Sequence, residues 1–103
     1  MSLSEEGVSV IMPCYNCANC VGEAIQSVLA QSYPEIEIIA IDDGSSDATW
    51  KVISSFGDRV EAHRQENQGA CRARNKGARI ASGKYLMFLD ADDVIAPDTI
   101  EAL

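Results

Sequence analysis

The sequence has no long hydrophobic run. None of its apolar stretches approaches the roughly 18 residues needed to cross a bilayer, which argues against an integral membrane protein. Its opening residues, MSLSEEG, lack the basic segment and the following apolar segment of a secretory signal. It also contains no repeat or low-complexity segment, and its 103 residues suffice for one domain, residues 1–103. We therefore expect a single globular domain in the cytoplasm.

Basic residues are scarce: eight Lys and Arg stand against sixteen Asp and Glu, for a net charge of −8. Such a chain is poorly suited to bind duplex nucleic acid, because that requires broad neutralisation of phosphates. The charge is unevenly distributed: residues 1–58 carry −8, residues 59–84 carry +5 and residues 85–103 carry −5. A basic segment enclosed by acidic ones suits a small phosphate ligand that also brings a divalent metal.

Hydrophobic periodicity alternates between strand-like and helix-like segments along the chain. The pattern predicts strands at residues 8–12, 36–41, 59–64 and 85–89. It predicts helices from an Asn19 cap to about residue 32, from a Ser46 or Asp47 cap to Gly57, over residues 69–81, and from Pro97 onward. This βαβαβαβα order predicts an α/β fold with a Rossmann-like, doubly wound, mostly parallel sheet and helices on both faces.

Polar residues follow each predicted strand, at the edge where ligands of open α/β sheets bind. They are Pro13-Cys14-Tyr15-Asn16 after the first strand, residues 42–47 after the second, Asn67-Gln68-Gly69 after the third and Asp90-Ala91-Asp92-Asp93 after the fourth. Crowding so many polar and acidic groups at one edge is costly unless a ligand or a metal uses them. We therefore expect the functional site at this edge.

The last of these segments holds three carboxylates, those of Asp90, Asp92 and Asp93, which repel one another at neutral pH. A hard cation such as Mg²⁺ or Mn²⁺ relieves that repulsion. Because side chains alternate along a strand, Asp90 and Asp92 are expected to point the same way, one toward a metal and the other toward a sugar hydroxyl. A solvated acidic turn before the last helix is the alternative.

Three other residues at this edge also have two interpretations each. Asp43 could accept a hydrogen bond from an N–H group of a pyrimidine base, or it could simply favour a tight turn. Tyr15 could stack on that base or cover the sheet edge. Arg74 could pair with a diphosphate or form a solvated salt bridge.

The four cysteines suggest a different class of site. Cys14, Cys17 and Cys20 form C-x-x-C-x-x-C, and Cys71 supplies a fourth thiol. Thiolates at this spacing can hold zinc or an iron–sulfur cluster. The other interpretation is a set of reduced, structural cysteines in a loop and a helix start, since the Cys-Pro that ends bacterial cluster motifs is missing.

The segments VSVIMPCYN, AIQSVLAQSYPEIEIIAIDDGSSDAT, ENQGACRARNKGARIASGKYLMFLDADD and PDTIEAL resemble the nucleotide-binding half of family 2 glycosyltransferases over about residues 7–103. The resemblance implies a GT-A fold and the metal-assisted, inverting transfer of a sugar from a nucleoside diphosphate donor, with Mn²⁺ or Mg²⁺. It implies a nucleotide-sugar site of Pro13, Tyr15 and Asp43 around the base (usually uracil), Asn16 in the first of these motifs, Arg74 near the base or diphosphate, and Asp90 near the ribose or donor sugar. Asp92 would bind the metal, with Asp93 as its neighbour.

The family's catalytic base lies in an acceptor-binding half and is expected beyond Leu103. We therefore expect this chain to be the donor-binding part of a longer enzyme, able to bind its donor but not to complete turnover. The expected partners are a UDP-linked sugar and a sugar, lipid or protein acceptor. At the level of the family we expect cell-envelope polysaccharide synthesis by a protein peripheral to the inner face of the membrane. Apolar sheet surface left exposed in this chain would favour self-association.

Residues 89–94, LDADDV, also resemble the first motif of haloacid-dehalogenase-like phosphatases, in which Asp90 would be the nucleophile. That motif normally opens its domain, whereas here it comes last, so its downstream partners are missing. It also leaves Asp43 and Arg74 unexplained. A regulatory nucleotide-binding module without transferase activity is a third alternative, which nothing up to Leu103 excludes.

Overall fold

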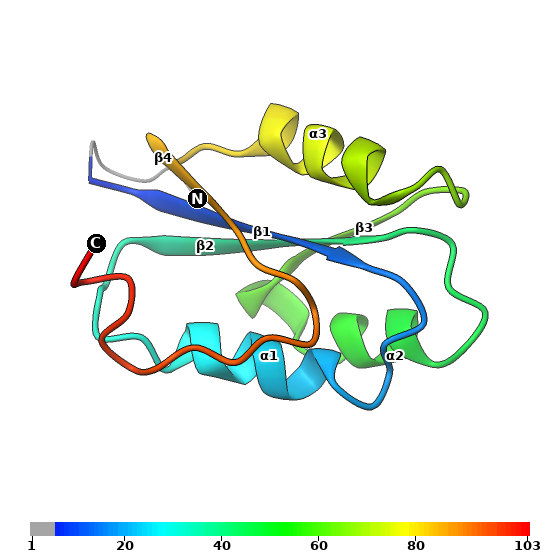
Figure 1. Cartoon of the computed structure of the whole chain (residues 1–103), viewed down its shortest axis with the longest axis horizontal. Helices are drawn as coiled ribbons and strands as arrows, with labels where there is room; N and C mark the ends of the chain where they lie inside the picture. The colour runs from blue at the N-terminus through cyan, green and yellow to red at the C-terminus, as the bar shows by residue number, and fades with distance from the viewer. Residues whose placement is uncertain (1–5) are drawn as a thin grey trace.

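The computed structural model describes residues 6–103, in which strands and helices alternate as the sequence predicted (Figure 1). The strands are β1 (Val8–Cys14), β2 (Ile36–Asp42), β3 (Glu61–Arg64) and β4 (Tyr85–Phe88). The helices are α1 (Val21–Leu29), α2 (Thr49–Ser54) and α3 (Ala70–Ile80), with a short 3₁₀ helix, η1 (Gly57–Arg59), before β3. Across residues 6–103, no helix combines the length and the apolarity that crossing a membrane requires. The expectation about a secretory signal depends mainly on residues 1–5, which lie outside the described residues.

The described strands form one parallel sheet in the order β3-β2-β1-β4. The central strand, β1, pairs with β2 along its whole length, with Val8 opposite Ile36 and Cys14 opposite Asp42. On its other side it pairs with β4 through residues 8–11. The chain therefore adds β2 and β3 on one side of β1 and then crosses over to place β4 on the other side. The strand order reverses between β1 and β4, so the switch point lies at the carboxyl ends of these two strands.

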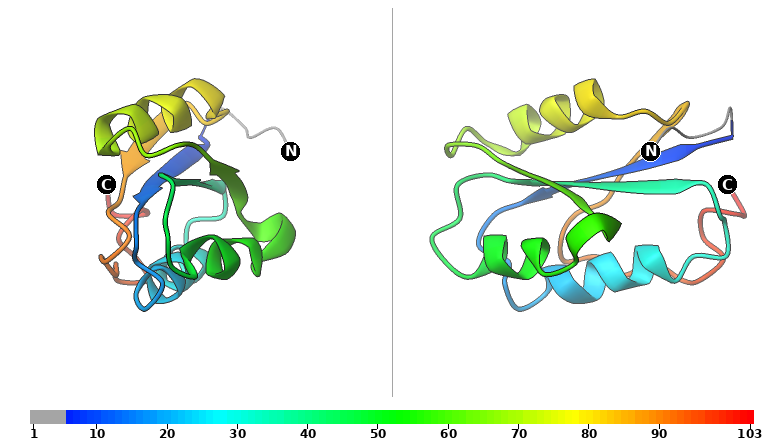
Figure 2. Two further views of the ribbon diagram at one scale, coloured as in Figure 1. Left: turned by 90° about the vertical axis from the view of Figure 1, so that its right-hand side faces the viewer. Right: turned by 180° about the vertical axis from the view of Figure 1, so that it is seen from behind.

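Helices cover both faces of the sheet, as a doubly wound fold requires. α1 and α2 lie on one face and α3 lies on the other (Figures 1 and 2). Fully buried side chains such as Val10, Met12 and Ile25 belong to the larger core cluster. Ile39, Ile41 and Ala73 form a smaller cluster between β2 and α3. Because the centres of β1 and β2 are buried on both faces, residues 10–12 and 38–41 are continuous apolar runs instead of alternating ones.

The helix predicted from Pro97 onward is wrong. Residues 97–102 form turns, and the side chain of Gln31, just after α1, explains why. In an α-helix the N–H of Ile100 would donate to the carbonyl of Ala96. Here the N–H of Ile100 donates to Gln31 Oε1 at 2.9 Å, and Gln31 Nε2 donates to the carbonyl of Ala96 at 2.6 Å. The side chain of Gln31 thus binds both the donor and the acceptor of the first hydrogen bond that a helix from Pro97 would form.

The predicted helix caps are only partly right. α1 begins at Val21 after Cys20, so Asn19 is not its cap. α2 begins at Thr49, and the carboxylate of Asp47 accepts hydrogen bonds from both the backbone N–H and the hydroxyl of Thr49. Asp47 therefore satisfies a free donor at the start of α2 as a cap would, although it lies one residue further out.

β4 forms one edge of the sheet and leaves apolar side chains exposed. Tyr85, Leu86 and Phe88 are 50%, 45% and 48% exposed. Tyr85 and Leu86 border a hollow of about 550 Å³ that Leu103 and Ile100 also line. The structure thus has the exposed apolar surface that the sequence analysis anticipated, and self-association through it stays a prediction.

Candidate functional site

The residues predicted to form the site meet at the switch point. Pro13, Tyr15, Asp43, Arg74 and Asp90 line a cavity of about 110 Å³. An adjoining cavity of about 470 Å³ shares Pro13 and Tyr15 with it and is also lined by Asn16 and Asp92. All seven predicted residues therefore line one of two neighbouring cavities, while their individual roles stay predictions.

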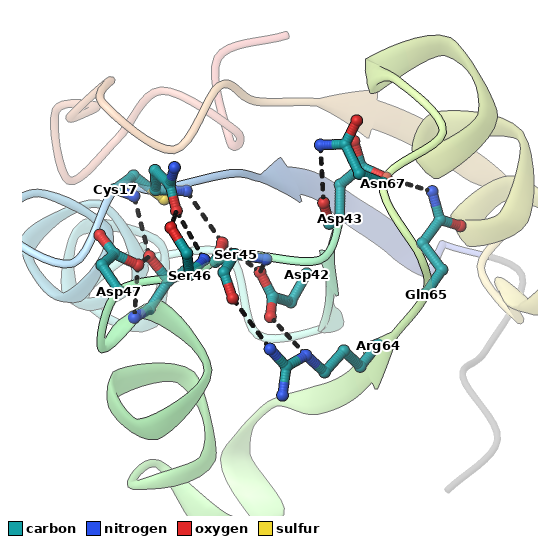
Figure 3. A network of polar contacts seen from close by, with 11 residues as sticks. Cys17, Asp42, Asp43, Ser45, Ser46, Asp47, Arg64, Gln65 and Asn67 are labelled. Carbon is teal, nitrogen blue, oxygen red and sulfur yellow. Dashed lines mark hydrogen bonds and ion pairs between the residues drawn. The ribbon is translucent and has the colours of Figure 1, made fainter.

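Asp43 follows β2 directly and is buried, with only 4% of its surface exposed. Its Oδ1 atom accepts hydrogen bonds from Gln65 Nε2 and the Gln68 N–H, both at 2.8 Å, and its Oδ2 atom accepts one from the Gly69 N–H at 3.0 Å (Figure 3 labels Asp43 and Gln65). Burial raises the pKa of Asp43, but these three bonds outweigh it and hold the pKa below its usual value. The carboxylate is therefore ionised, and its described contacts leave one of its roughly four acceptor positions for a ligand.

The neighbouring carboxylate, Asp42, has a different task. It is fully buried; its Oδ1 atom accepts from the Ser45 hydroxyl, and its Oδ2 atom lies 3.2 Å from Arg64 Nε. Arg64 also donates to the backbone carbonyl of Ser45 at 2.9 Å (Figure 3). Asp42 thus fixes the turn after β2, whereas the adjacent Asp43 lines the cavity.

The loop after β1 is fastened to this same turn. The N–H of Asn16 donates to Ser45 Oγ at 2.9 Å, and Asn16 Oδ1 accepts from the Ser46 N–H at 2.8 Å. Cys17 N–H donates to Thr49 Oγ1 at 2.8 Å (Figure 3). Asn16 has a φ of 47°, a left-handed conformation that Asn tolerates better than most residues. Its side chain therefore positions the loop that carries Tyr15, and it also lines the larger cavity.

Tyr15 and Arg74 give the site an aromatic face and a cation. Tyr15 is 53% exposed, so its ring is accessible to a ligand. Arg74, on the first turns of α3, has Nη2 at 3.6 Å from Asp90 Oδ1. Both side chains of this ion pair are substantially exposed, so it contributes little to stability. Its effect is to hold a positive charge beside the acidic residues after β4.

Asp90, Asp92 and Asp93 converge as the sequence analysis expected, but for another reason. β4 ends at Phe88, so the three residues do not continue a strand, and strand alternation does not orient them. They lie in a turn closed by a hydrogen bond from the Asp93 N–H to the Asp90 carbonyl at 3.0 Å. The turn places one oxygen of each carboxylate within 4.8 Å of the others, and all three residues are exposed. This all-oxygen donor set fits Mg²⁺ or Mn²⁺.

The cysteine-based metal site gains no support. Within residues 6–103, Asp90, Asp92 and Asp93 form the only set of three or more His, Cys, Asp or Glu side chains with ligand atoms that close together. Cys14, Cys17 and Cys20 therefore do not converge on one position.

Sequence reasoning missed several residues of the site. Cys17, Asn19 and Cys20 line the larger cavity, and the side chain of Gln65 holds Asp43 in place. The position of residues 17–20 after the first strand was a signal for the first three, because the β1–α1 loop lies at the carboxyl end of the sheet. Nothing in the sequence pattern indicated the role of Gln65, since its contact with Asp43 depends on how β3 pairs with β2.

The fold and the site define a class of protein: a doubly wound α/β domain with acidic residues and one arginine around a cavity at the switch point. The family model of glycosyl transferase family 2 matches residues 9–103, and the chain belongs to this family. The family resemblance noted in the sequence is thereby confirmed. Family membership leaves the phosphatase interpretation of Asp90 without support.

Two curated relatives illustrate the likeness. The chain is 47% identical over 94 residues to an uncharacterised glycosyltransferase of Rickettsia prowazekii, which is 91% of this chain and 30% of that protein. It is 38% identical over 102 residues to the glycosyltransferase GlyG of Streptococcus pneumoniae, which is 95% of this chain and 34% of that protein. The chain thus spans about a third of the length of these relatives.

Solved structures agree with the predicted fold. S. aureus TarS 1–349 in complex with UDP-GlcNAc aligns with a TM-score of 0.83 at 27% identity, over 93% of this chain and 29% of that one. The mannosyltransferase PcManGT from Pyrobaculum calidifontis, in complex with GDP-Man and Mn²⁺, aligns with a TM-score of 0.75 at 27% identity, over 84% of this chain and 28% of that one. The predicted Rossmann-like fold of the GT-A type is confirmed.

Proposed function

We propose that this chain is the donor-binding part of a glycosyltransferase that transfers a sugar from a nucleoside diphosphate sugar, UDP-linked, to an acceptor. The observation that carries the proposal is the meeting of Asp43, Arg74 and Asp90 around one cavity at the switch point. The buried carboxylate of Asp43 suits the base of such a donor, and the cation of Arg74 suits its diphosphate. The acidic cluster after β4 suits a divalent metal. The complexes of TarS with UDP-GlcNAc and of PcManGT with GDP-Man support a nucleotide sugar as the ligand class.

Asp43 and Tyr15 are suited to hold the base. Uracil presents an N–H group in its ring, and the ionised carboxylate of Asp43 has an unused acceptor position in the cavity wall. Three hydrogen bonds already fix this carboxylate, so binding of the N–H group of the base does not cost the entropy of ordering the Asp43 side chain. The exposed ring of Tyr15 offers a stacking face for the base, with Pro13 beside it.

Asp92, with Asp90 and Asp93, would hold the metal, and Arg74 would face the diphosphate. When bound, Mn²⁺ or Mg²⁺ supplies a Lewis acid that stabilises the charge developing on the leaving diphosphate. Asp43 and Tyr15 fix the nucleoside at one end of the donor, so the anomeric carbon is directed outward to the acceptor. PcManGT with bound Mn²⁺ supports the use of a divalent cation at such a site.

The remaining parts of the reaction belong to the longer protein that we propose. Its catalytic base and acceptor site are supplied by residues after Leu103, and the displacement inverts the anomeric configuration. The acceptor is a sugar, lipid or protein, and we propose a cytoplasmic location with synthesis of envelope polysaccharide at the inner face of the membrane. By this proposal the 103-residue chain binds the donor without turning it over.

The test is calorimetric titration of the chain with UDP, first with Mn²⁺ and then with EDTA. We expect binding that EDTA abolishes. Asp92→Ala should lose the metal-dependent part of the affinity, and Asp43→Asn should weaken UDP binding by about tenfold, since a buried acceptor is replaced by a donor. Asp58→Asn, which changes an exposed carboxylate in η1, is the matched control and should bind as the unchanged chain does.

Titration with GDP in parallel tests the choice of base. Tighter binding of UDP than of GDP, lost in Asp43→Asn, supports the assignment of uracil to this carboxylate. Equal affinity for the two nucleotides contradicts that assignment. A folded chain that binds neither nucleotide in the presence of Mn²⁺ contradicts the proposal that residues 1–103 bind the donor.

A further inference from the structure

The loop between β1 and α1 carries three thiols in the wall of the site, and the proposed function uses none of them. Cys14, at the end of β1, is buried, with 1% of its surface exposed. Cys17 and Cys20 are half-buried, and both line the larger cavity together with Tyr15 and Asp92. All three are free thiols in this structure, so their chemistry is available.

The backbone brings Cys17 and Cys20 close to one another. The N–H of Cys20 donates to the carbonyl of Cys17 at 3.0 Å, and the N–H of Val21 donates to the same carbonyl at 2.9 Å. A turn closed by such an i to i+3 bond holds its end Cα atoms within about 7 Å, and a disulfide spans Cα atoms about 4.4–6.8 Å apart. The Cys20 thiol also turns back toward this carbonyl, with Sγ at 3.5 Å from the oxygen. The turn thus brings the backbone of the two residues within the range that a disulfide can span.

Cys17 is the more reactive member of the pair. The neighbouring Cys14 thiol lowers the pKa of Cys17; burial and the charge of Asp47 oppose this, and contacts with Thr49 and the Tyr15 backbone assist it. The interaction with Cys17, together with burial, raises the pKa of Cys14, so Cys14 stays protonated. The thiolate is the reactive form of cysteine, and Cys17 therefore supplies it at neutral pH.

We propose that Cys17 and Cys20 form a peroxide-sensitive dithiol, in which a hydroperoxide oxidises Cys17 and Cys20 then closes a disulfide across the turn. The Cys17 thiolate attacks the peroxide O–O bond, which gives a sulfenic acid and releases the other oxygen as water, or as an alcohol from an organic peroxide, after it takes up a proton. The Cys20 sulfur then attacks the Cys17 sulfur. The S–S bond forms, and the sulfenic hydroxyl leaves as water with the proton of the Cys20 thiol. The two thiols lose two electrons, which the peroxide accepts.

Cys20 resolves the sulfenic acid in preference to Cys14 for two reasons. Cys14 is buried, and its thiol lies against the Met12 carbonyl at 3.3 Å, so it has little access to the cavity. Cys20 lies at the cavity, where water can enter and leave, and the turn closed by its own N–H brings it back to Cys17. Cys71 lies exposed on α3, which covers the other face of the sheet, so it serves as an internal reference for an ordinary surface thiol.

The disulfide would close a part of the donor site. Residues 16–18 are fastened to the turn after β2 by the bonds of Asn16 to Ser45 and of Cys17 to Thr49, so a disulfide between residues 17 and 20 joins two side chains of a wall that has little freedom to adjust. That wall belongs to the cavity lined by Tyr15 and Asp92. We therefore expect oxidation to weaken binding of a nucleoside diphosphate with its metal. This consequence rests on the proposed function, whereas the formation of the disulfide does not.

The first experiment treats the full chain with hydrogen peroxide at neutral pH, followed by alkylation and peptide mass spectrometry. We expect a Cys17–Cys20 disulfide, with Cys17 consumed about tenfold faster than Cys71. Cys20→Ser should accumulate a sulfenic acid on Cys17, which dimedone traps, while Cys71→Ser should form the disulfide as the unchanged chain does. A Cys14–Cys17 disulfide, a disulfide that persists in Cys20→Ser, or Cys17 oxidation no faster than that of Cys71 would overturn the proposal.

The second experiment titrates reduced, oxidised and re-reduced samples with UDP and Mn²⁺. We expect oxidation to lower the affinity by about tenfold, because the disulfide changes the shape of a preformed cavity wall, and dithiothreitol to restore it. If the disulfide forms and the affinity stays the same, its proposed effect on the donor site is wrong. If the reduced chain does not bind UDP, the proposed function fails, and the dithiol is still judged by its mass spectrum.

Discussion

The Oδ2 atom of Asp43 accepts a hydrogen bond from the backbone N–H of Gly69 at 3.0 Å, so a carboxylate that follows β2 holds the residue before α3. Gly69 has a φ of 97°, a conformation that a side chain would disfavour. The adjacent N–H of Gln68 donates to the Oδ1 atom of the same carboxylate at 2.8 Å. These two bonds orient the start of α3 and thereby bring Arg74 to the cavity.

Asp43→Asn should therefore destabilise the fold as well as weaken nucleotide binding. The amide places an NH₂ group against an N–H donor, which leaves a buried donor unsatisfied. We expect the free energy of unfolding to fall by about 1–3 kcal/mol, measured by urea denaturation. Asp58→Asn removes an exposed carboxylate and should change the stability by less than about 0.5 kcal/mol. Equal stability of the two variants would contradict the structural role of Asp43.

Stability should fall in acid, partly through the same carboxylate. The hydrogen bonds to Asp43 outweigh its burial and lower its pKa in the folded state, so below pH 5 the unfolded state binds more protons at this site. Its contribution is present above the unfolded pKa of about 3.9 and is lost as the pH falls through the lower folded value. Burial raises the pKa of Glu37, but hydrogen bonds from Ser9 and Ser82 outweigh it and lower the pKa, and hydrogen bonds from Thr49 lower the pKa of Asp47. Both carboxylates therefore also contribute stability that is lost in acid.

Urea denaturation from pH 7 to pH 3 measures this dependence. Asp43→Asn should reduce the slope between about pH 4 and pH 3 by up to about 1.4 kcal/mol per pH unit, which corresponds to one proton. A variant with the same slope as the unchanged chain would show that Asp43 is not held in its ionised form by folding.

Gly77→Ala should destabilise the chain although alanine favours helices. A β-carbon on Gly77 would lie under 3.0 Å from Ile11 Cγ2, closer than real contacts of this kind, because α3 packs directly on β1. We expect a loss of about 1–3 kcal/mol from overpacking, which exceeds the gain of about 1 kcal/mol from helix propensity. Gly22→Ala in α1 is the control, because its nearest atom would lie at 3.4 Å, an ordinary contact. Thermal denaturation of both variants measures the difference, and a stabilised Gly77→Ala would contradict this packing.

Self-association should depend on β4. Leu86 is 45% exposed on this edge strand, so Leu86→Lys places a charge on the apolar surface and should shift the chain toward a monomer. Sedimentation velocity at several concentrations measures the shift. Leu29→Lys introduces the same charge on α1, where Leu29 is 37% exposed, and should leave the association unchanged. A chain that is monomeric at every concentration would show that the prediction of self-association is wrong.

The sequence predicted the elements well because each carries a local signal. The apolar runs at residues 8–12 and 36–41 and the turn residues after them give the strands and their ends, and βαβ connections dictate a parallel sheet. The same signals placed Asp43 and Asp90 at one edge, because every parallel strand ends there, and Arg74 on the helix that starts at that edge. Local signals failed at Pro97, where contacts of the distant Gln31 side chain override propensity, and at Asn19, where α1 begins one residue later than its cap signal indicated.

The sequence by itself determined the alternation of strands and helices, the edge at which function lies and the family to which the chain belongs. Only the tertiary structure decided that β4 crosses to the far side of β1, which sets Asp90 beside Arg74 in a shared cavity. It also decided that a turn, and not a strand, gathers the three carboxylates after β4, and that Gln31 takes the hydrogen bonds with which the last helix would begin. The physical reason is the same in each case: periodicity encodes which residues are buried, whereas hydrogen bonds between residues far apart in the chain form only once the sheet has fixed their distance.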